Sequence, residues 1–195
     1  MRMIIRFAIV AALLAACGGR QDFSAPRNAN DACALIAERP AYLQATRAAE
    51  RRWGVPVPVQ LAIIHAESSF IGDARTPVRY TLGVIPMGRQ SSAYGYSQAL
   101  DGTWEEYLQE TGNRRARREN IHDATDFIGW YSTKSRERNG IALYDARNLY
   151  LAYHEGHAGF RRQSYNSKPW LLGVAQRVET RAIMYDTQLR RCGRR

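Results

Sequence analysis

The sequence predicts a mainly α protein that forms one domain behind an N-terminal leader. Apolar residues recur at helical spacing in six or seven segments, most of them bounded by Gly, Pro or a capping residue. Only one stretch has the composition of a short strand or hairpin. The 195 residues are 45% hydrophobic and contain no repeat or low-complexity tract, so the chain is long and apolar enough to bury one core.

Residues 1–16 have the pattern of a bacterial export signal. Arg2 and Arg6 supply a positively charged start, and Ile4–Ala16 is a mostly apolar stretch that ends in small residues. This stretch is shorter than the run of about 20 apolar residues that spans a bilayer comfortably. We therefore interpret it as a signal peptide.

The end of this segment, Leu14–Cys17 (LAAC), resembles the lipobox of bacterial lipoproteins. The resemblance implies cleavage before Cys17 and a diacylglyceryl group on its sulfur, so that acyl chains anchor the protein in a membrane. Residues 17–30 have the turn-rich composition of a linker, and residues 31–195 form the single predicted domain. The alternative is an ordinary secreted protein that is cut near Ala16.

The cysteine count fits this interpretation. Lipidation of Cys17 leaves Cys33 and Cys192, one near each end of the domain. In an oxidising cell envelope these two can form a disulfide bond, although two unpaired thiols remain the alternative. In the chain-entropy description a loop of this length contributes about 4–5 kcal/mol to the free energy of unfolding.

The predicted helices are bounded by residues that suit helix ends. Asp31 suits the N-cap of the first helix, and Pro40 stops it. Gly54 suits the left-handed position after the second helix, and Pro169 suits the first turn of the last one. The predicted helices are Asp31–Glu38, Ala41–Trp53, Val59–Phe70, Asp101–Glu110, Asn120–Asn139, Asp145–Glu155 and Trp170–Arg190.

Residues 71–92 interrupt the helical pattern. Within them, Arg79–Ile85 (RYTLGVI) has the composition of a short strand or hairpin, with Pro and Gly on either side. A loop of about 20 residues inside a compact domain is usually functional or disordered. We interpret this irregular or β-hairpin insertion as a substrate-facing flap.

Glu67 is the unusual residue of the helical pattern. It stands near the end of a helix that Leu61, Ile63 and Ile64 help to make apolar almost all round, which predicts burial. Desolvation and the partly negative helix C-terminus both disfavour an ionised carboxylate, so the pKa of Glu67 should be raised. General-acid catalysis needs a carboxylic acid that keeps its proton near neutral pH. The alternative is a structural Glu that reaches solvent or an Arg.

A later segment, Ala93–Gln98 (AYGYSQ), carries residues that suit a ligand groove. Tyr94 and Tyr96 offer aromatic faces for stacking. Gly95 permits close approach of a backbone, and Gln98 can both donate and accept hydrogen bonds. Alone, these features are weak indications of a site.

Ala152–Gly156 (AYHEG) is the third such segment, where an apolar helical run ends. Glu67–Phe70 (ESSF), Ala93–Gln98 and Ala152–Gly156, in this order, resemble the motifs of the lysozyme-like lytic transglycosylases of the soluble-transglycosylase (SLT) type. That family shows Glu-Ser-x-Phe, then Gly-Leu-Met-Gln after Ala-x, then Ala-Tyr-Asn. The first motif matches fully, the second has Tyr and Ser in place of Leu and Met, and the third has His154 in place of Asn.

The resemblance implies a helical domain like that of goose-type lysozyme, acting on peptidoglycan. It implies that Glu67 is the catalytic acid and then base in non-hydrolytic cleavage of the β-1,4 bond between N-acetylmuramic acid and N-acetylglucosamine, giving 1,6-anhydro ends. It also implies that Tyr153 orients Glu67 or the substrate's acetamido group, and that no cofactor is needed. The predicted substrate-binding and supporting residues are Ser68, Tyr94, Gly95, Tyr96, Gln98, Tyr153 and His154.

Two other functions remain open at this point. A hydrolytic muramidase of the goose-type lysozyme kind would need a second carboxylate, for which Glu155 beside Tyr153 is the first candidate. A non-catalytic wall-binding lipoprotein would keep the sugar groove but lose the acid. We expect no metal site, because His154 and His157 are three residues apart whereas the zincin pair requires a spacing of four.

The net charge of +10 predicts an anionic environment. The cluster Asn113–Arg118 (NRRARR) has no interleaved aromatic residue, and an exported lipoprotein rarely meets nucleic acid, so we expect no nucleic-acid partner. We expect a monomer that binds glycan strands and is attached to a membrane through Cys17. Gly18 after that cysteine is not the Asp that resembles an inner-membrane retention signal, which favours the outer membrane, facing the periplasm.

Overall fold

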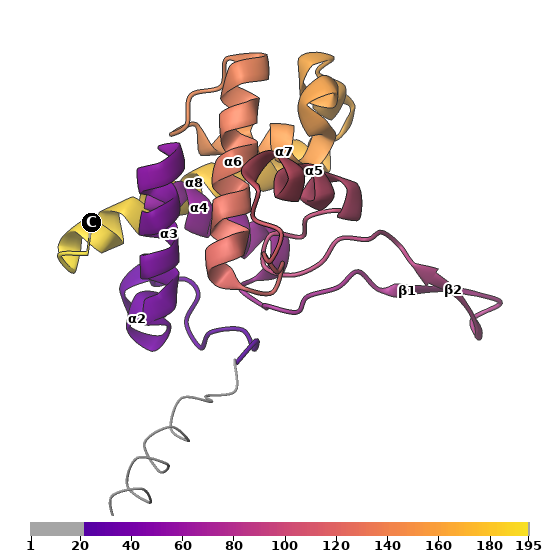
Figure 1. Ribbon diagram of the computed structural model, residues 1–195, viewed down its shortest axis with the longest axis horizontal. Coiled ribbons are helices and arrows are strands. Elements are labelled where there is room, and N and C mark those ends of the chain that lie inside the picture. The colour runs from indigo at the N-terminus through magenta and orange to yellow at the C-terminus, as the bar shows by residue number, and fades with distance from the viewer. Residues whose placement is uncertain (1–21, 195) are drawn as a thin grey trace, which may run out of the picture.

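The computed structural model describes residues 22–194, which form a helical body with one projecting hairpin (Figure 1). This part of the chain contains seven α-helices, one short 3₁₀ helix and one two-stranded antiparallel sheet. The predicted fold class, mainly α with a small hairpin insertion, is therefore confirmed. No helix within these residues is both long enough and apolar enough to cross a membrane. The predicted signal peptide and Cys17 lie outside the described residues.

The first two helices lie within one residue of their predicted bounds, and Asp31 and Gly54 cap them as predicted. The helix α2 (Ala32–Glu38) is capped by the carboxylate of Asp31, which accepts hydrogen bonds from two backbone N–H groups of the first turn. The next helix, α3 (Pro40–Trp53), has its proline in the first turn and is followed by Gly54 with a left-handed φ of 78°. Local sequence therefore explains both boundaries.

The central helix α4 (Val57–Ser68) begins and ends two residues earlier than predicted. It can begin before Pro58 because the first turn of a helix leaves its N–H groups without helical partners. It ends because Ser69 and Phe70 adopt left-handed backbone conformations, with φ of 50° and 64°. Phe70 is nevertheless fully buried, as a core residue would be. Glu67 consequently lies in the last turn of the helix.

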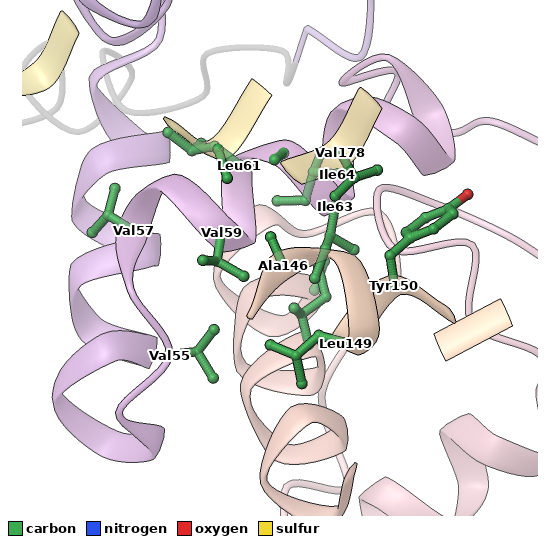
Figure 2. Close-up of a cluster of buried hydrophobic side chains, with 14 of the residues drawn as sticks. Val55, Val57, Val59, Leu61, Ile63, Ile64, Ala146, Leu149, Tyr150 and Val178 are labelled. Atoms are coloured by element: carbon green, nitrogen blue, oxygen red, sulfur yellow. The ribbon is translucent and has the colours of Figure 1, made fainter. Parts of the chain in front are cut away.

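Figure 2 shows how the apolar side chains of α4 meet those of its neighbours. The helix packs against α8 (Pro169–Arg191) and α7 (Ala146–Arg161), and Ile63 and Ile64 are completely buried in this contact. Tyr150 of α7 borders the same cluster and points its hydroxyl group away from it (Figure 2). The packing therefore fixes the helix that carries Glu67 from several sides.

The remaining helices surround this centre, and α7 extends furthest beyond its predicted end. The predicted end of α7 was Glu155, but the helix resumes beyond a kink at Gly156 and continues to Arg161. Gly156 has φ 72° and ψ 158°, a conformation that is open to glycine and strained for other residues. The other elements of this part are α5 (Asp101–Thr111), α6 (Ile121–Asn139) and the 3₁₀ helix η2 (Ser164–Ser167).

The insertion forms a two-stranded hairpin that is longer than predicted. Its strands are β1 (Val78–Thr81) and β2 (Ile85–Arg89), which pair antiparallel with Thr81 opposite Ile85. The hairpin extends away from the helical body (Figure 1), and all its residues after Val78 are exposed. It does not fold back over the helices as a closed flap would.

The predicted disulfide between Cys33 and Cys192 is present. It joins α2 to the residue after α8, with the two Cα atoms 6.3 Å apart and 159 positions apart in the sequence. The bond therefore closes a loop that contains nearly the whole domain.

Candidate active site

Glu67 is held by the end of α4, and Ser68 ties that end to the segment of residues 93–98. The Ser68 hydroxyl lies 3.2 Å from the carbonyl oxygen of Ile64 and 2.9 Å from that of Tyr96. Ser68 is itself buried. Its predicted supporting role thus has a physical basis, because it fixes two of the motif segments against each other.

The Glu67 carboxyl group has a raised pKa. Glu67 is partly buried beside the apolar centre of the fold. Burial raises its pKa to about 7, although a hydrogen bond from the Tyr150 hydroxyl acts in the opposite direction by favouring the ionised form. Glu67 is therefore protonated in a large fraction of molecules near neutral pH.

Two tyrosines of α7 face Glu67, and the sequence had indicated only one. Tyr150 donates the side-chain hydrogen bond to Glu67, whereas the Tyr153 hydroxyl donates to the carbonyl oxygen of Ser97 at 2.6 Å. Burial raises the pKa of Tyr153 well above its usual value, and the charge of Glu67 raises it further, so Tyr153 is coupled to the acid electrostatically. The spacing of three residues puts Tyr150 and Tyr153 on one helical face, which is the signal that identifies Tyr150.

The backbone at Gly95 requires glycine. Its φ is 79°, and a Cβ atom there would lie 2.2 Å from the carbonyl oxygen of Arg118. The close approach expected at Gly95 is thus to a neighbouring loop of the protein. The Gln98 amide nitrogen donates to the carbonyl oxygens of Ala74 and Gly95, at 2.9 and 2.8 Å, and so holds the same turn together.

The two tyrosines of this segment differ in their surroundings. Tyr96 is only 2% exposed and its hydroxyl lies 3.3 Å from that of Tyr42, so it belongs to the core. Tyr94 is partly buried between two arginines, with the guanidinium of Arg75 4.0 Å and that of Arg118 5.4 Å from its ring centre. The prediction of a free aromatic face is wrong for Tyr96, because packing against Tyr42 of α3 buries its ring. For Tyr94, which is partly exposed, it stays a prediction.

A hollow of about 260 Å³ opens beside Tyr153. It brings together three of the predicted residues, Gln98, Tyr153 and His154, at the junction of α7 with the segment that precedes α5. The other lining residues are Ala99, Leu100, Thr103, Phe127, Tyr131, Glu155 and Gly156. Polar groups set among aromatic side chains are typical of a ligand-binding pocket.

A comparison with protein-family models matches residues 5–192 to the family described as the transglycosylase SLT domain. The chain belongs to this family. The resemblance drawn from the three motifs is thereby confirmed, and family membership indicates a lytic transglycosylase acting on peptidoglycan. A sequence search of the curated proteins finds no match.

In this SLT domain Glu155 lies in a cluster of charged and polar groups. Its side chain is only 4% exposed, with the Lys168 ammonium at 2.7 Å, the His154 Nδ1 at 3.0 Å and the Ser164 hydroxyl as a hydrogen-bond donor. Burial alone would raise its pKa, but the hydrogen bonds from Lys168, Ser164 and His154 lower it to about 2. Glu155 is therefore an ionised structural carboxylate.

Arg118 is a second residue whose role the sequence does not reveal. Its guanidinium donates to the carbonyl oxygens of Ser92 and Ala99, at 3.1 and 2.9 Å, and pairs with Asp101 at 2.8 Å. This arginine therefore braces the segment of the SLT domain that carries Gly95 and Gln98. The remaining arginines of the basic cluster are exposed, as a solvated charge run would be.

Metal ligands do not gather in the part of the SLT domain that the structure describes. Among residues 22–194, no three His, Cys, Asp or Glu side chains are grouped so that they could hold an ion. His157 instead stacks on Tyr131, with ring centres 4.4 Å apart, and its Nε2 lies 3.1 Å from the Ser135 hydroxyl. These contacts give His157 a structural position.

Proposed function

We propose that Glu67 acts as a single catalytic acid and then base in the non-hydrolytic cleavage of peptidoglycan. The observation that carries the proposal is the state of this carboxyl group. It is in the last turn of a buried helix, its pKa is raised to about 7, and Tyr150 holds it by a hydrogen bond. A group with a pKa near the working pH can give up a proton and take one back in the same cycle.

In the first step, Glu67 donates its proton to the oxygen of the bond between N-acetylmuramic acid and N-acetylglucosamine, and the bond from that oxygen to C1 breaks. The 2-acetamido oxygen of the muramic acid sugar stabilises the cationic C1, in place of a second enzyme carboxylate. In the second step, ionised Glu67 takes the proton of the C6 hydroxyl, whose oxygen bonds to C1. The products are a free 4-hydroxyl group and a 1,6-anhydro end, and no water is consumed.

The surrounding residues support this scheme in different ways. Tyr150 and Tyr153 orient the carboxyl group and the reacting sugar, while Ser68, Gly95 and Gln98 hold the site's framework. The hollow beside Tyr153 and His154 has the size and polarity to bind part of the glycan next to the scissile bond.

The state of Glu155 favours one carboxylate over two. A hydrolytic muramidase would use a second carboxylate to activate water. The Glu155 oxygens are already engaged by Lys168 and Ser164, which leaves them poorly suited to take a proton from water. This observation supports the transglycosylase over the muramidase.

The test is mass spectrometry of the products from purified peptidoglycan, with wild type beside Glu67→Gln. We expect wild-type products lighter by one water than hydrolysis products, and none from the variant. Glu137→Gln, an exposed carboxylate of α6, is the matched control and should behave like wild type.

Each other outcome points to a different function. Products with reducing ends would support the muramidase and would lead next to Glu155. If neither protein cleaved the polymer but both sedimented with it, the wall-binding lipoprotein would be favoured.

We propose further that the protein is lipidated on Cys17 and lies in the outer membrane, facing the periplasm. The proposal rests on the lipobox-like LAAC sequence and on Gly18 after it. Labelling with a radioactive fatty acid should be lost in Cys17→Ser. Recovery of the labelled protein only in the inner membrane would contradict the sorting.

A further inference from the structure

The hairpin differs from the rest of the surface in having a concentration of exposed apolar side chains. Among its residues the exposed fractions are 58% for Tyr80, 85% for Leu82, 76% for Val84, 50% for Ile85 and 66% for Met87. These five residues lie within eight positions of one another on an arm that extends from the body (Figure 1). Contiguous exposed apolar surface of this kind marks an interaction site.

The two strands of the hairpin pair with each other, and no third strand joins them among the described residues. An isolated two-stranded hairpin is marginally stable in water. Its turn, at Leu82 and Gly83, has two successive positive φ values, 56° and 75°, and presents a large apolar side chain at the very tip. A partner that buries this tip would therefore stabilise the hairpin as well as bind it.

The charges of the arm have one sign. Between Asp73 and Asp101 the chain contains no acidic residue, and its only charged residues there are Arg75, Arg79 and Arg89. The Arg89 guanidinium donates to the carbonyl oxygen of Thr76 at 2.7 Å, which keeps it at the root of the arm. An apolar tip with cations behind it suits the boundary of an anionic bilayer. The acyl chains would bury the apolar side chains, and the anionic headgroups would pair with the arginines.

The N-terminal end of the described chain emerges at the root of this arm. The backbone N–H of Gly72 donates to the carbonyl oxygen of Phe23 at 3.0 Å, and the Phe23 ring packs on Gly72. Cys17 is five residues before Asp22, a reach of at most about 18 Å for an extended chain. The segment that leads back to Cys17 and the arm that carries the hairpin thus leave the domain at neighbouring places, which suits two contacts with one surface.

We propose that the tip of the hairpin inserts into the headgroup boundary of an anionic phospholipid bilayer, as a second contact beside the lipid on Cys17. The inference rests on the proposed attachment for its location and does not depend on Glu67. Glycan is a poorer occupant, because sugars are bound through polar side chains and aromatic faces, and of the five exposed apolar residues only Tyr80 offers either. Two contacts would fix the orientation of the domain, which a single flexible linker cannot do.

The test uses the unlipidated chain from Gly18 onward, which contains the complete core described above, in flotation with phospholipid vesicles. We expect it to float with vesicles of phosphatidylethanolamine and phosphatidylglycerol and much less with phosphatidylcholine vesicles. The double variant Leu82→Asp/Val84→Asp should bind at least roughly tenfold more weakly, since two apolar contacts are replaced by charges. Arg79→Gln should weaken binding roughly fivefold, because a cation near an anionic surface contributes about that factor.

Ile183→Asp is the matched control, since Ile183 is 64% exposed but belongs to α8. It should bind like wild type, and melting curves should show that all variants are folded. Equal flotation of wild type and the double variant, or no flotation of wild type, would overturn the proposal. The proposal would also be overturned if the double variant still floated with vesicles but no longer self-associated or no longer sedimented with peptidoglycan. The tip would then bind a second copy or the glycan.

Failure of this proposal is distinguishable from failure of the proposed function. The double variant should still produce anhydro ends from purified peptidoglycan without vesicles, because the tip lies outside the Glu67 site. Glu67→Gln should still float.

Discussion

Glu67 and Glu155 are two carboxylates with little exposed surface on either side of Tyr153, and their pKa values move in opposite directions. Glu67 has apolar helix residues and two tyrosine hydroxyls around it, and its pKa rises to about 7. Glu155 has Lys168, Ser164 and His154 around it, and its pKa falls to about 2. Both start from the same ordinary value of 4.5.

The difference shows that burial alone does not decide the chemistry of a carboxylate. Desolvation raises both pKa values, but only Glu155 has a cation and enough donors to overcome it. The first environment yields an acid that can exchange its proton near neutral pH, and the second a fixed negative charge. The comparison can be tested on activity and on stability.

The largest expected effect is on catalysis. Glu67→Gln keeps the size and a hydrogen-bond acceptor for Tyr150 but cannot transfer a proton, so the rate of anhydro-end formation should fall by roughly a thousandfold or more. Glu155→Gln should retain cleavage and give the same products, because Glu155 transfers no proton in the proposed scheme. Comparable losses in both variants would remove the distinction between the two residues.

The second effect is on the free energy of unfolding, which should be higher for the inactive variant Glu67→Gln than for wild type near neutral pH. Because the folded-state pKa of Glu67 exceeds its ordinary value of 4.5, the native state binds the extra proton between that pH and about 7. Wild type should lose stability as pH rises through this window, by about 1–3 kcal/mol in total. Glu67→Gln has no charge to desolvate and should lose none of this stability.

Urea unfolding of both proteins at several pH values from acid to slightly alkaline checks this. The two curves of unfolding free energy against pH should diverge as pH rises, with the variant the more stable. Parallel curves would mean that Glu67 is not desolvated in the native state.

Glu155→Gln should change the free energy of unfolding in the opposite direction, making the protein less stable than wild type at neutral pH. Its native pKa of about 2 is below 4.5, so the stabilisation is fully present above that pH and is lost as pH falls toward 2. At neutral pH the variant should be less stable than wild type by roughly 1–3 kcal/mol, because Lys168 loses its partner. The difference in unfolding free energy between wild type and Glu155→Gln should disappear as the pH falls toward 2. The control Glu137→Gln should differ little from wild type at any pH. A constant difference across pH would contradict the ion-pair account.

The helices and the central acid could be predicted from the sequence because their signals are local. Asp31, Gly54 and Pro169 act within a few residues, and the apolar pattern of α4 alone predicts its burial. Glu67 was identified because it breaks that pattern. The end of α4 was missed by two residues, since left-handed backbone at Ser69 and Phe70 is set by tertiary contacts.

The arrangement around the acid could not be predicted, since it depends on contacts between distant segments. Tyr96 was expected to stack on a ligand, but packing against Tyr42 places it in the core. In the sequence Arg118 cannot be distinguished from the other arginines of its cluster. Only the fold shows that it donates to the carbonyl oxygens of Ser92 and Ala99. Tyr150 matched no motif. Its spacing from Tyr153 places both on one helical face, but only the hydrogen bond to Glu67 shows its role.

Tyr150→Phe should give the smallest effect, and it tests the first half of the comparison. Its hydroxyl favours the ionised carboxylate, so removing it should raise the pKa of Glu67 further. The rate that requires protonated Glu67 should therefore remain high to a higher pH than in wild type, while the maximum rate falls by less than about tenfold. Tyr144→Phe, at a 79% exposed position, should leave the pH profile of cleavage unchanged. If Tyr150→Phe lowered the rate equally at every pH, Tyr150 would only pack against α4. The pKa of Glu67 would then not depend on a hydrogen bond from Tyr150.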